Sequence, residues 1–340
     1  MGSILVVLII LGCAVYQYFK GSLVGSLVTL MIVIWGSAVA FGYFEFLSDV
    51  LFVRQGIESL MPWAQMLSFA MLFVLTFAIL QTGASRLISK NTNLGLRPEQ
   101  VGRVCCGILL GLMLSGLLLT AVAMGPLSSK YPYQRFDSTR LDVERPNKGA
   151  LLNADGFVAG WFSLISRGGM SGERSFAALH PRFLDQLYLN RLGGGEISIT
   201  GPEAIEIPRE KAVWTAPEGL QGAEGKGNLT IVRVGIKQKS GKFTLSQVRL
   251  ICKQKDDAKK PFAGKGINVY PVGYLRTPEL LEIKRLNEPV EVWQKFIDFA
   301  FEIPENFVPV LVEFKQNNVA QVPAPVPAEQ RPAEEPAPSG

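Results

Sequence analysis

Four long apolar runs without charged residues fill the first third of the chain. A helix needs about 20 apolar residues to cross the hydrocarbon core of a bilayer, and each run reaches or approaches that length. Charged residues lie between the runs. The pattern therefore predicts an α-helical membrane domain of four transmembrane helices within residues 1–127, formed by residues 3–19, 23–44, 64–81 and 104–124.

The first run has two possible roles, a retained helix or a signal peptide. A signal peptide starts with a positive region and ends at a small-residue cleavage site. No Lys or Arg precedes Ser3, and no A-x-A sequence follows Phe19. We therefore expect a helix that is retained.

Basic residues between the runs predict the orientation of the helices. Short loops that are rich in Lys and Arg face the cytoplasm. The turn at Lys20 and the loop 83–103 hold most of these residues, whereas the loop 45–63 contains only Arg54. We therefore expect the turn and the loop 83–103 on the cytoplasmic side, and everything after Pro126 outside it. Apolar residues within 45–63 also predict an amphipathic helix on the membrane surface.

Small residues at a spacing of four predict close helix packing. They occur at Gly21 and Gly25, at Ala38 and Gly42, and at Gly107 and Gly111. Such pairs let helix backbones approach closely in lipid. The contact could lie within one chain or between copies in a homo-oligomer.

The four runs contain no Asp, Glu, Lys, Arg or His. Coupled transporters usually need such groups near the middle of the bilayer, so the sequence disfavours a pump or a coupled carrier. A small oligomeric channel or export component remains open, lined by hydroxyl groups and backbone. Ser37, Thr76, Ser115 and Thr120 supply hydroxyls, which we expect to bond to neighbouring backbone instead.

Three features of the first 125 residues occur together. A short first run ends in the turn Lys20-Gly21, and the third run continues into the basic amphipathic stretch 85–90. A Leu-containing loop then leads through Glu99 into a fourth run with Gly107 and Gly111. In these features the chain resembles the CvpA family, the colicin V production proteins.

The resemblance is incomplete at the start of the fourth run. The family pattern there is roughly D-R-x-L-G-x-x-x-G-x-x-R-G. The acid and the two later glycines are present, whereas Gln100 and Leu110 replace Arg and Arg103 replaces Gly. The resemblance implies a bacterial inner-membrane protein that acts in toxin production or secretion, or in envelope homeostasis, through protein contacts. It implies the lipid bilayer and either further copies or envelope proteins as partners, and it names no reaction.

The remaining two thirds of the chain has the pattern of a water-exposed protein. Residues 128–195 predict a polar linker with short helices at 155–165 and 175–192, the second limited by Pro181. Beyond them the apolar period changes to two, which predicts strands of an antiparallel, immunoglobulin-like β-sandwich over 196–317 with residues 299–315 as a final hairpin. The strands are expected at 196–200, 228–237, 243–252, 266–274, 296–303 and 309–315. The Pro/Ala/Glu-rich residues 318–340 predict a disordered tail.

Composition argues against several kinds of chemistry. The net charge of +5 is small and its basic residues are scattered, which disfavours nucleic acid as a partner. Cys252 is the only cysteine outside the apolar runs, and His180 is the only histidine, which we expect to be a packing residue. Residues 219–227 fail the phosphate-loop spacing at Leu220 and Gly227. We therefore expect no enzyme, cofactor or metal site; a membrane-anchored hydrolase would have to depend on His180.

Overall fold

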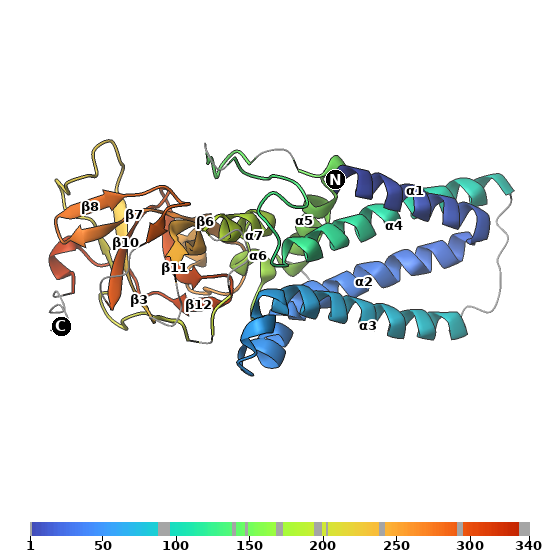
Figure 1. Ribbon diagram of the computed structural model, residues 1–340, viewed down its shortest axis with the longest axis horizontal. Helices are drawn as coiled ribbons and strands as arrows, with labels where there is room; N and C mark the ends of the chain where they lie inside the picture. Colours follow the sequence, from blue (N-terminus) through green and yellow to red (C-terminus); the bar gives the residue numbers. More distant parts are fainter. Residues whose placement is uncertain are drawn as a thin grey trace. The chain divides into compact units, whose positions relative to one another are not determined.

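The chain divides into two compact units (Figure 1). A helical unit comprises Met1–Asp137 and Asp142–Leu164, and a β unit comprises Ser138–Leu141 and Ile165–Gly340. The computed structural model describes residues 2–87, 96–137, 141–146, 149–167, 173–193, 199–201, 203–237, 242–290 and 295–332.

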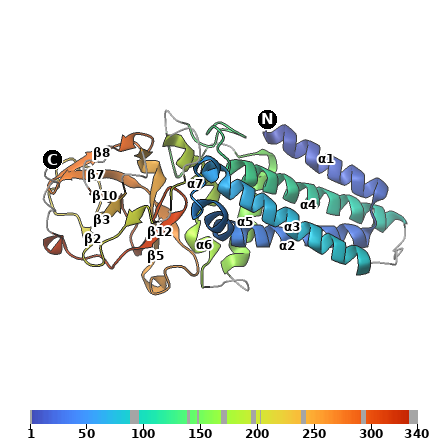
Figure 2. The ribbon, with the colours of Figure 1, turned by 60° about the horizontal axis from the view of Figure 1, so that its bottom comes forward.

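Four long helices form the helical unit, as the apolar runs predict. Each is long and apolar enough to cross a membrane. In both views α1 lies along α4, and α2 lies along α3 (Figures 1 and 2). The helices are α1 (Gly2–Lys20), α2 (Leu23–Ser48), α3 (Ala64–Leu87) and α4 (Leu96–Ala123).

The helices alternate in direction. Gly107 of α4 faces Ala14 of α1 and Gly111 faces Ile10, so these two helices are antiparallel. Gly102, near the start of α4, faces Leu23 at the start of α2. The end of α1, the start of α2 and the start of α4 therefore lie at one end of the bundle, and α4 ends at the other.

The second helix is longer than its apolar run. It extends to Ser48 because the N–H of Asp49 still bonds to the carbonyls of Glu45 and Phe46. One turn of π-helix (Asp49–Val53) and a 3₁₀ helix (Glu58–Trp63) then lead into α3. Residues 45–48 therefore belong to α2. The prediction that they are part of a separate amphipathic helix is wrong.

The stretch expected to be a linker instead packs onto the four helices. The predicted helix at 155–165 is confirmed as α5 (Ala154–Arg167). Ala150 and Ala154 are buried in one apolar cluster with Val6 of α1 and Leu119 of α4. The helical unit therefore continues to Leu164 rather than ending at residue 127.

Two short helices in the β unit replace the single stretch predicted at 175–192. They are α6 (Phe176–Leu179) and α7 (Phe183–Asn190). Pro181 and the left-handed backbone of Arg182, with φ of 56°, separate them. The predicted effect of Pro181 is therefore confirmed.

Antiparallel sheets form the rest of the β unit. The larger sheet has the order β1-β3-β10-β7-β8, with β2 also paired to β3, and the second has the order β12-β11-β5-β6. The larger sheet contains β1 (Ile205–Glu206), β2 (Val213–Thr215), β3 (Leu229–Ile236), β7 (Pro271–Thr277), β8 (Leu280–Ile283) and β10 (Phe296–Glu302). The second contains β5 (Val248–Gln254), β6 (Ile267–Val269), β11 (Phe307–Phe314) and β12 (Asn318–Gln321), and β4 (Phe243–Thr244) pairs separately with β9 (Pro289–Val290).

One hydrophobic core joins the two larger sheets. Val232 and Phe299 from one sheet and Leu250 and Val312 from the other are buried together. Alternate residues of each strand thus point to a shared interior, which fits the predicted period of two. The immunoglobulin-like arrangement stays a prediction.

The hairpin predicted over residues 299–315 is wrong. β10 pairs with β3 and β7, whereas β11 pairs with β5 and β12. Between them the chain turns at Asn306, which has a φ of 67°, and crosses from one sheet to the other. Phe299 of β10 and Phe314 of β11 then lie in the same buried core, to which they contribute from different sheets.

Two predicted strands are each divided into two shorter elements. A 3₁₀ turn at Leu245–Gln247 interrupts the strand predicted at 243–252, and Thr244 and Gln247 form a capping box there. The strand predicted at 266–274 becomes β6 and β7, which belong to different sheets. The strand predicted at 196–200 lies largely outside the described residues, and Ile199 and Thr200 are not in a strand.

The β unit includes residues that were expected in the disordered tail. β12 pairs with β11, and Val322 is buried. The N–H of Val326 donates to the carbonyl of Val213 at 2.9 Å, so backbone bonds hold the chain beyond β12. Residues 333–340 lie outside the described residues.

Candidate functional site

Gly107 and Gly111 form a close contact between two of the long helices. A Cβ atom on Gly107 would lie 2.8 Å from the Cα of Ala14, and one on Gly111 would lie 2.5 Å from the Cα of Ile10. Both distances are shorter than real side chains adopt, so only glycine fits here. The structure therefore places this pair in an intramolecular contact between α4 and α1.

Lys20 and Gly21 form the turn between the first two helices. Lys20 is the last residue of α1, and Gly21 lies outside both helices. Ser22 caps α2, since its Oγ accepts a bond from the N–H of Gly25 at 3.1 Å. The predicted helix face of Gly21 and Gly25 is therefore wrong, because Gly21 belongs to the turn and Gly25 to the capped first turn.

The approach of α2 to α3 uses a glycine that the spacing rule did not identify. No atom of the described residues lies within 4 Å of a Cβ position on Gly42 of the predicted pair. Gly36 instead faces the ring of Phe73, whose nearest atom would lie 3.3 Å from a Cβ. Gly116 of α4 is similar, since Ala154 and Val158 of α5 pack against its backbone.

Glu99 forms an ion pair with Arg103, one turn later on α4. The Glu99 side chain is nearly buried and that of Arg103 is partly exposed. Arg103 is also the residue that stands in place of a glycine of the family pattern. The pair therefore neutralises a carboxylate at the end of the bundle where α4 begins.

Three of the four hydroxyl groups named in the sequence donate to the backbone of their own helix, as predicted. Ser37 donates to the carbonyl of Ile34 at 2.7 Å, and Ser115 to that of Leu112 at 3.0 Å. Thr120 donates to the carbonyl of Gly116 at 2.8 Å. Each of these three hydroxyls therefore donates its proton within its own helix.

A buried carboxylate lies among the helices although none of the four runs contains one. Asp155, at the start of α5, is fully buried. The hydroxyl of Tyr133 donates to its Oδ2, and its Oδ1 accepts from the N–H of Gly156 at 3.0 Å. Arg135 in turn donates to the Tyr133 oxygen at 3.3 Å. The sequence pattern does not reveal this group, because Tyr133 and Asp155 lie 22 residues apart within the expected linker.

We expect Asp155→Ala to destabilise the helical unit by about 3 kcal/mol. A hydrogen bond to a charged group contributes about 1.5–3 kcal/mol, and a buried partner left without an acceptor costs more. Asp49→Ala is the matched control, because Asp49 pairs with Arg54 at an exposed site and should cost at most about 1 kcal/mol. Unfolding of the full chain in mixed detergent micelles measures both losses, and equal losses would contradict the assigned role.

The β unit contains a second buried ionic group. Arg249 of β5 and Glu313 of β11 form an ion pair, and both side chains are almost fully buried. Arg249 also donates to the carbonyl of Leu179 and to Asn268 Oδ1, each at 2.7 Å. These bonds fasten α6 and β6 to the sheet, so the group is structural.

His180 has the surroundings of a packing residue, as predicted. Its ring lies 5.0 Å from that of Phe176 and 5.3 Å from that of Phe183, centroid to centroid. Its Nδ1 lies 3.1 Å from Oε1 of Gln186. Among the described residues, no group of three His, Cys, Asp or Glu side chains could hold a metal ion.

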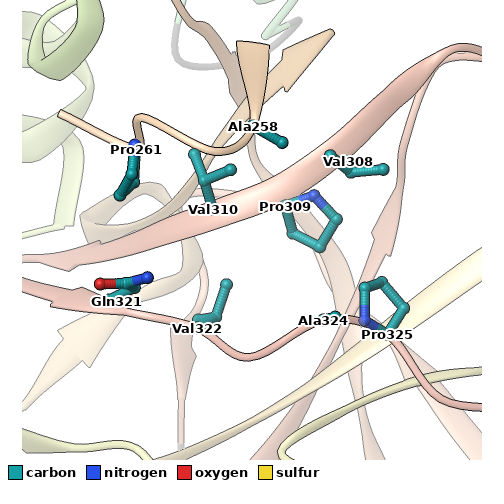
Figure 3. A pocket seen from close by; sticks show the side chains of 9 residues that line it. All are labelled: Ala258, Pro261, Val308, Pro309, Val310, Gln321, Val322, Ala324 and Pro325. Atoms are coloured by element: carbon teal, nitrogen blue, oxygen red, sulfur yellow. The ribbon is translucent and has the colours of Figure 1, made fainter. Parts of the chain in front are cut away.

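A shallow apolar groove lies on the second sheet of the β unit (Figure 3). Val308–Val310 of β11 form its floor, and Pro261 and Pro325 stand at its sides. Gln321 is its only polar side chain. The groove therefore offers apolar contact surface and no group for acid–base or nucleophilic chemistry.

Burial alters the titration of Lys315, at the turn after β11. It lowers the pKa of this ammonium group to about 8. The unfolded chain keeps a pKa near 10.4, so between these values it binds more protons than the folded chain. Stability therefore increases with pH across this interval and is lowest below it.

Lys315→Met should remove this dependence. We expect the variant to be more stable than the natural chain at about pH 7, and the difference to shrink by at most about 1.4 kcal/mol per pH unit toward about pH 10. Unfolding free energies across that range measure the difference. Lys237→Met, at a largely exposed lysine, is the control and should show no such trend. A difference for Lys315→Met that stays constant with pH would contradict the assignment.

No protein-family model, no curated protein and no solved structure matches this chain. The resemblance of residues 1–125 to the colicin V production proteins therefore stays a prediction that rests on the residues quoted for it.

Proposed function

We propose that the protein is a four-span inner-membrane protein of the CvpA type that acts through protein contacts. Its process would be toxin production or secretion, or maintenance of the envelope. The β unit would be an immunoglobulin-like, extracytoplasmic module that meets envelope partners. No catalytic step is part of the proposal.

The distribution of basic residues over the helix ends carries the proposal. Lys20 ends α1, Arg86 lies in the last turn of α3, and Arg103 lies in the first turns of α4. Because the helices alternate in direction, these three residues lie at the same end of the bundle. Lys and Arg mark the cytoplasmic end, and the chain leaves α4 at the opposite end. This supports an extracytoplasmic β unit.

A channel is less well supported. Three of the hydroxyl groups that a pore would need are bonded to their own helices, and Asp155 is enclosed by Tyr133 and Gly156. The extended contact between α1 and α4 favours a rigid membrane anchor over a channel that opens and closes.

Reporter fusions test the topology. An enzyme active only outside the cytoplasm, fused after the last residue of the full chain, should be active, and the same enzyme inserted at residue 92 should be inactive. A cytoplasm-active fluorescent protein at the two positions should give the reverse pattern. Reporters that place the chain's end in the cytoplasm would overturn the extracytoplasmic assignment.

Deletion of the gene tests the process. We expect loss of colicin V export or increased sensitivity to detergents, restored by the full chain. A variant truncated after residue 167 keeps the helical unit and should fail to restore either property. Normal export and normal detergent resistance in the deletion strain would contradict the proposal, and solute flux through purified protein in liposomes would favour a channel.

A further inference from the structure

The exposed face of α5 is apolar, whereas a helix face in contact with water is normally polar. Phe157, Trp161 and Leu164 lie three or four residues apart on this face and are 42%, 39% and 59% exposed. Helices on a protein surface normally present charged or polar residues there. The opposite face, with Ala154, Val158 and Phe162, is buried.

The turn before α5 continues this face. Leu151 and Leu152 are 43% and 64% exposed, and Leu152 has a left-handed backbone with φ of 57°. A positive φ is rare for a bulky residue that is not glycine. The turn thus exposes two leucines. A turn of this kind in water usually contains Asn, Asp or Gly instead.

The contacts of α5 set its level along the bundle. Ala154 and Val158 pack on Gly116, and the ring of Phe162 stacks on that of Phe41 at 5.1 Å. At about 1.5 Å per residue, Gly116 lies about 18 Å along α4 from Val104, the first residue after the last charge. The hydrocarbon core of a bilayer is about 30 Å thick. If this core begins at Val104, Gly116 and the start of α5 lie about 12 Å from its outer boundary.

We propose that α5 and the turn at Leu151-Leu152 form a re-entrant element that binds the acyl chains of the outer leaflet. Its exposed apolar face lies at the same level as exposed apolar residues of α1, such as Ile4 and Leu8. Lipid is the occupant that fits a surface continuous with the spans. The inference rests on the proposal that the four helices cross a membrane.

Spin labels in the full chain test this inference. The four cysteines are replaced by Ser, and single cysteines at Leu152, Phe157 or Leu164 carry the label in phosphatidylcholine–phosphatidylglycerol liposomes. Val74 of α3, which is 62% exposed, is the membrane reference, and Lys226 of the β unit is the water reference. We expect all three positions to resemble Val74, with high accessibility to oxygen and low accessibility to a water-soluble nickel complex.

The outcomes separate the two proposals. Labels at Leu152, Phe157 and Leu164 that resemble Lys226, while Val74 stays protected, would overturn the re-entrant element and leave the spans intact. A water-accessible label at Val74 would overturn both.

Tryptophan fluorescence gives a second measurement in a chain that keeps its cysteines. Trp161→Phe should remove emission that lipids with brominated acyl chains quench in the natural protein. If the emission lost in this variant is instead quenched by aqueous iodide, the element does not reach the acyl chains.

Discussion

Gly111→Leu should separate α1 from α4 and destabilise the helical unit by about 3 kcal/mol or more. The reason is the backbone of α1, because a Cβ on Gly111 would already lie 2.5 Å from the Cα of Ile10 and 3.2 Å from its nitrogen. Neither atom can move without shifting the helix. Titration of the full chain with SDS in mixed micelles measures the loss.

Gly12 provides a matched control on α1. A Cβ there would have no neighbour within 4 Å in the part of the chain that the structure describes, so Gly12→Leu should leave stability unchanged within about 0.5 kcal/mol. Substitution of each glycine by Ala makes a second comparison. Gly111→Ala still adds the clashing Cβ, whereas Gly12→Ala only replaces glycine by a residue that favours the helix more. We expect a loss for the first and no loss for the second. Equal behaviour of the two sites would show that Gly111 does not face α1.

Glu313→Ala should destabilise the β unit by about 3–5 kcal/mol, the usual cost of breaking a buried ion pair. Among the described residues, it leaves the buried guanidinium of Arg249 with Asn268 and the Leu179 carbonyl as partners. Hydrogen exchange of β5 and β11 in the full chain should increase, because both strands open together when the group is lost.

Two further variants separate the effect of the buried charge from the effect of lost side-chain packing. Glu203→Ala removes a pair with Lys237, in which the Glu203 side chain is 87% exposed and that of Lys237 55%, and should cost at most about 1 kcal/mol. Combining Glu313→Leu with Arg249→Met removes both charges and fills the space, so it should recover much of the loss. A double variant as unstable as Glu313→Ala would show that shape rather than charge is responsible.

The helices could be predicted because their signal is local. An uncharged run of about 20 residues has no good alternative to a membrane helix. The period of two likewise identified β3, β10 and β11. Strands of two to four residues, such as β1, β2 and β12, carry too few alternations to be identified, and their pairing depends on distant partners.

The glycine motifs show where spacing stops being informative. Gly107 and Gly111 lie one turn apart on one helix and both meet α1. Gly21 has the same spacing to Gly25 but lies in a turn, and Gly42 faces no neighbour. Spacing selects residues on one face, whereas the direction of that face depends on the other helices.

The sequence by itself determined a membrane-compatible helical half, a β-rich half and the end at which the basic residues gather, because each follows from apolar length, period or charge along the chain. Only the tertiary structure decided that β10 and β11 face each other across a core, and that residues 142–164 belong to the helical unit. It also enclosed Asp155 and turned the apolar face of α5 outward. These features depend on contacts between distant residues, which no local pattern records.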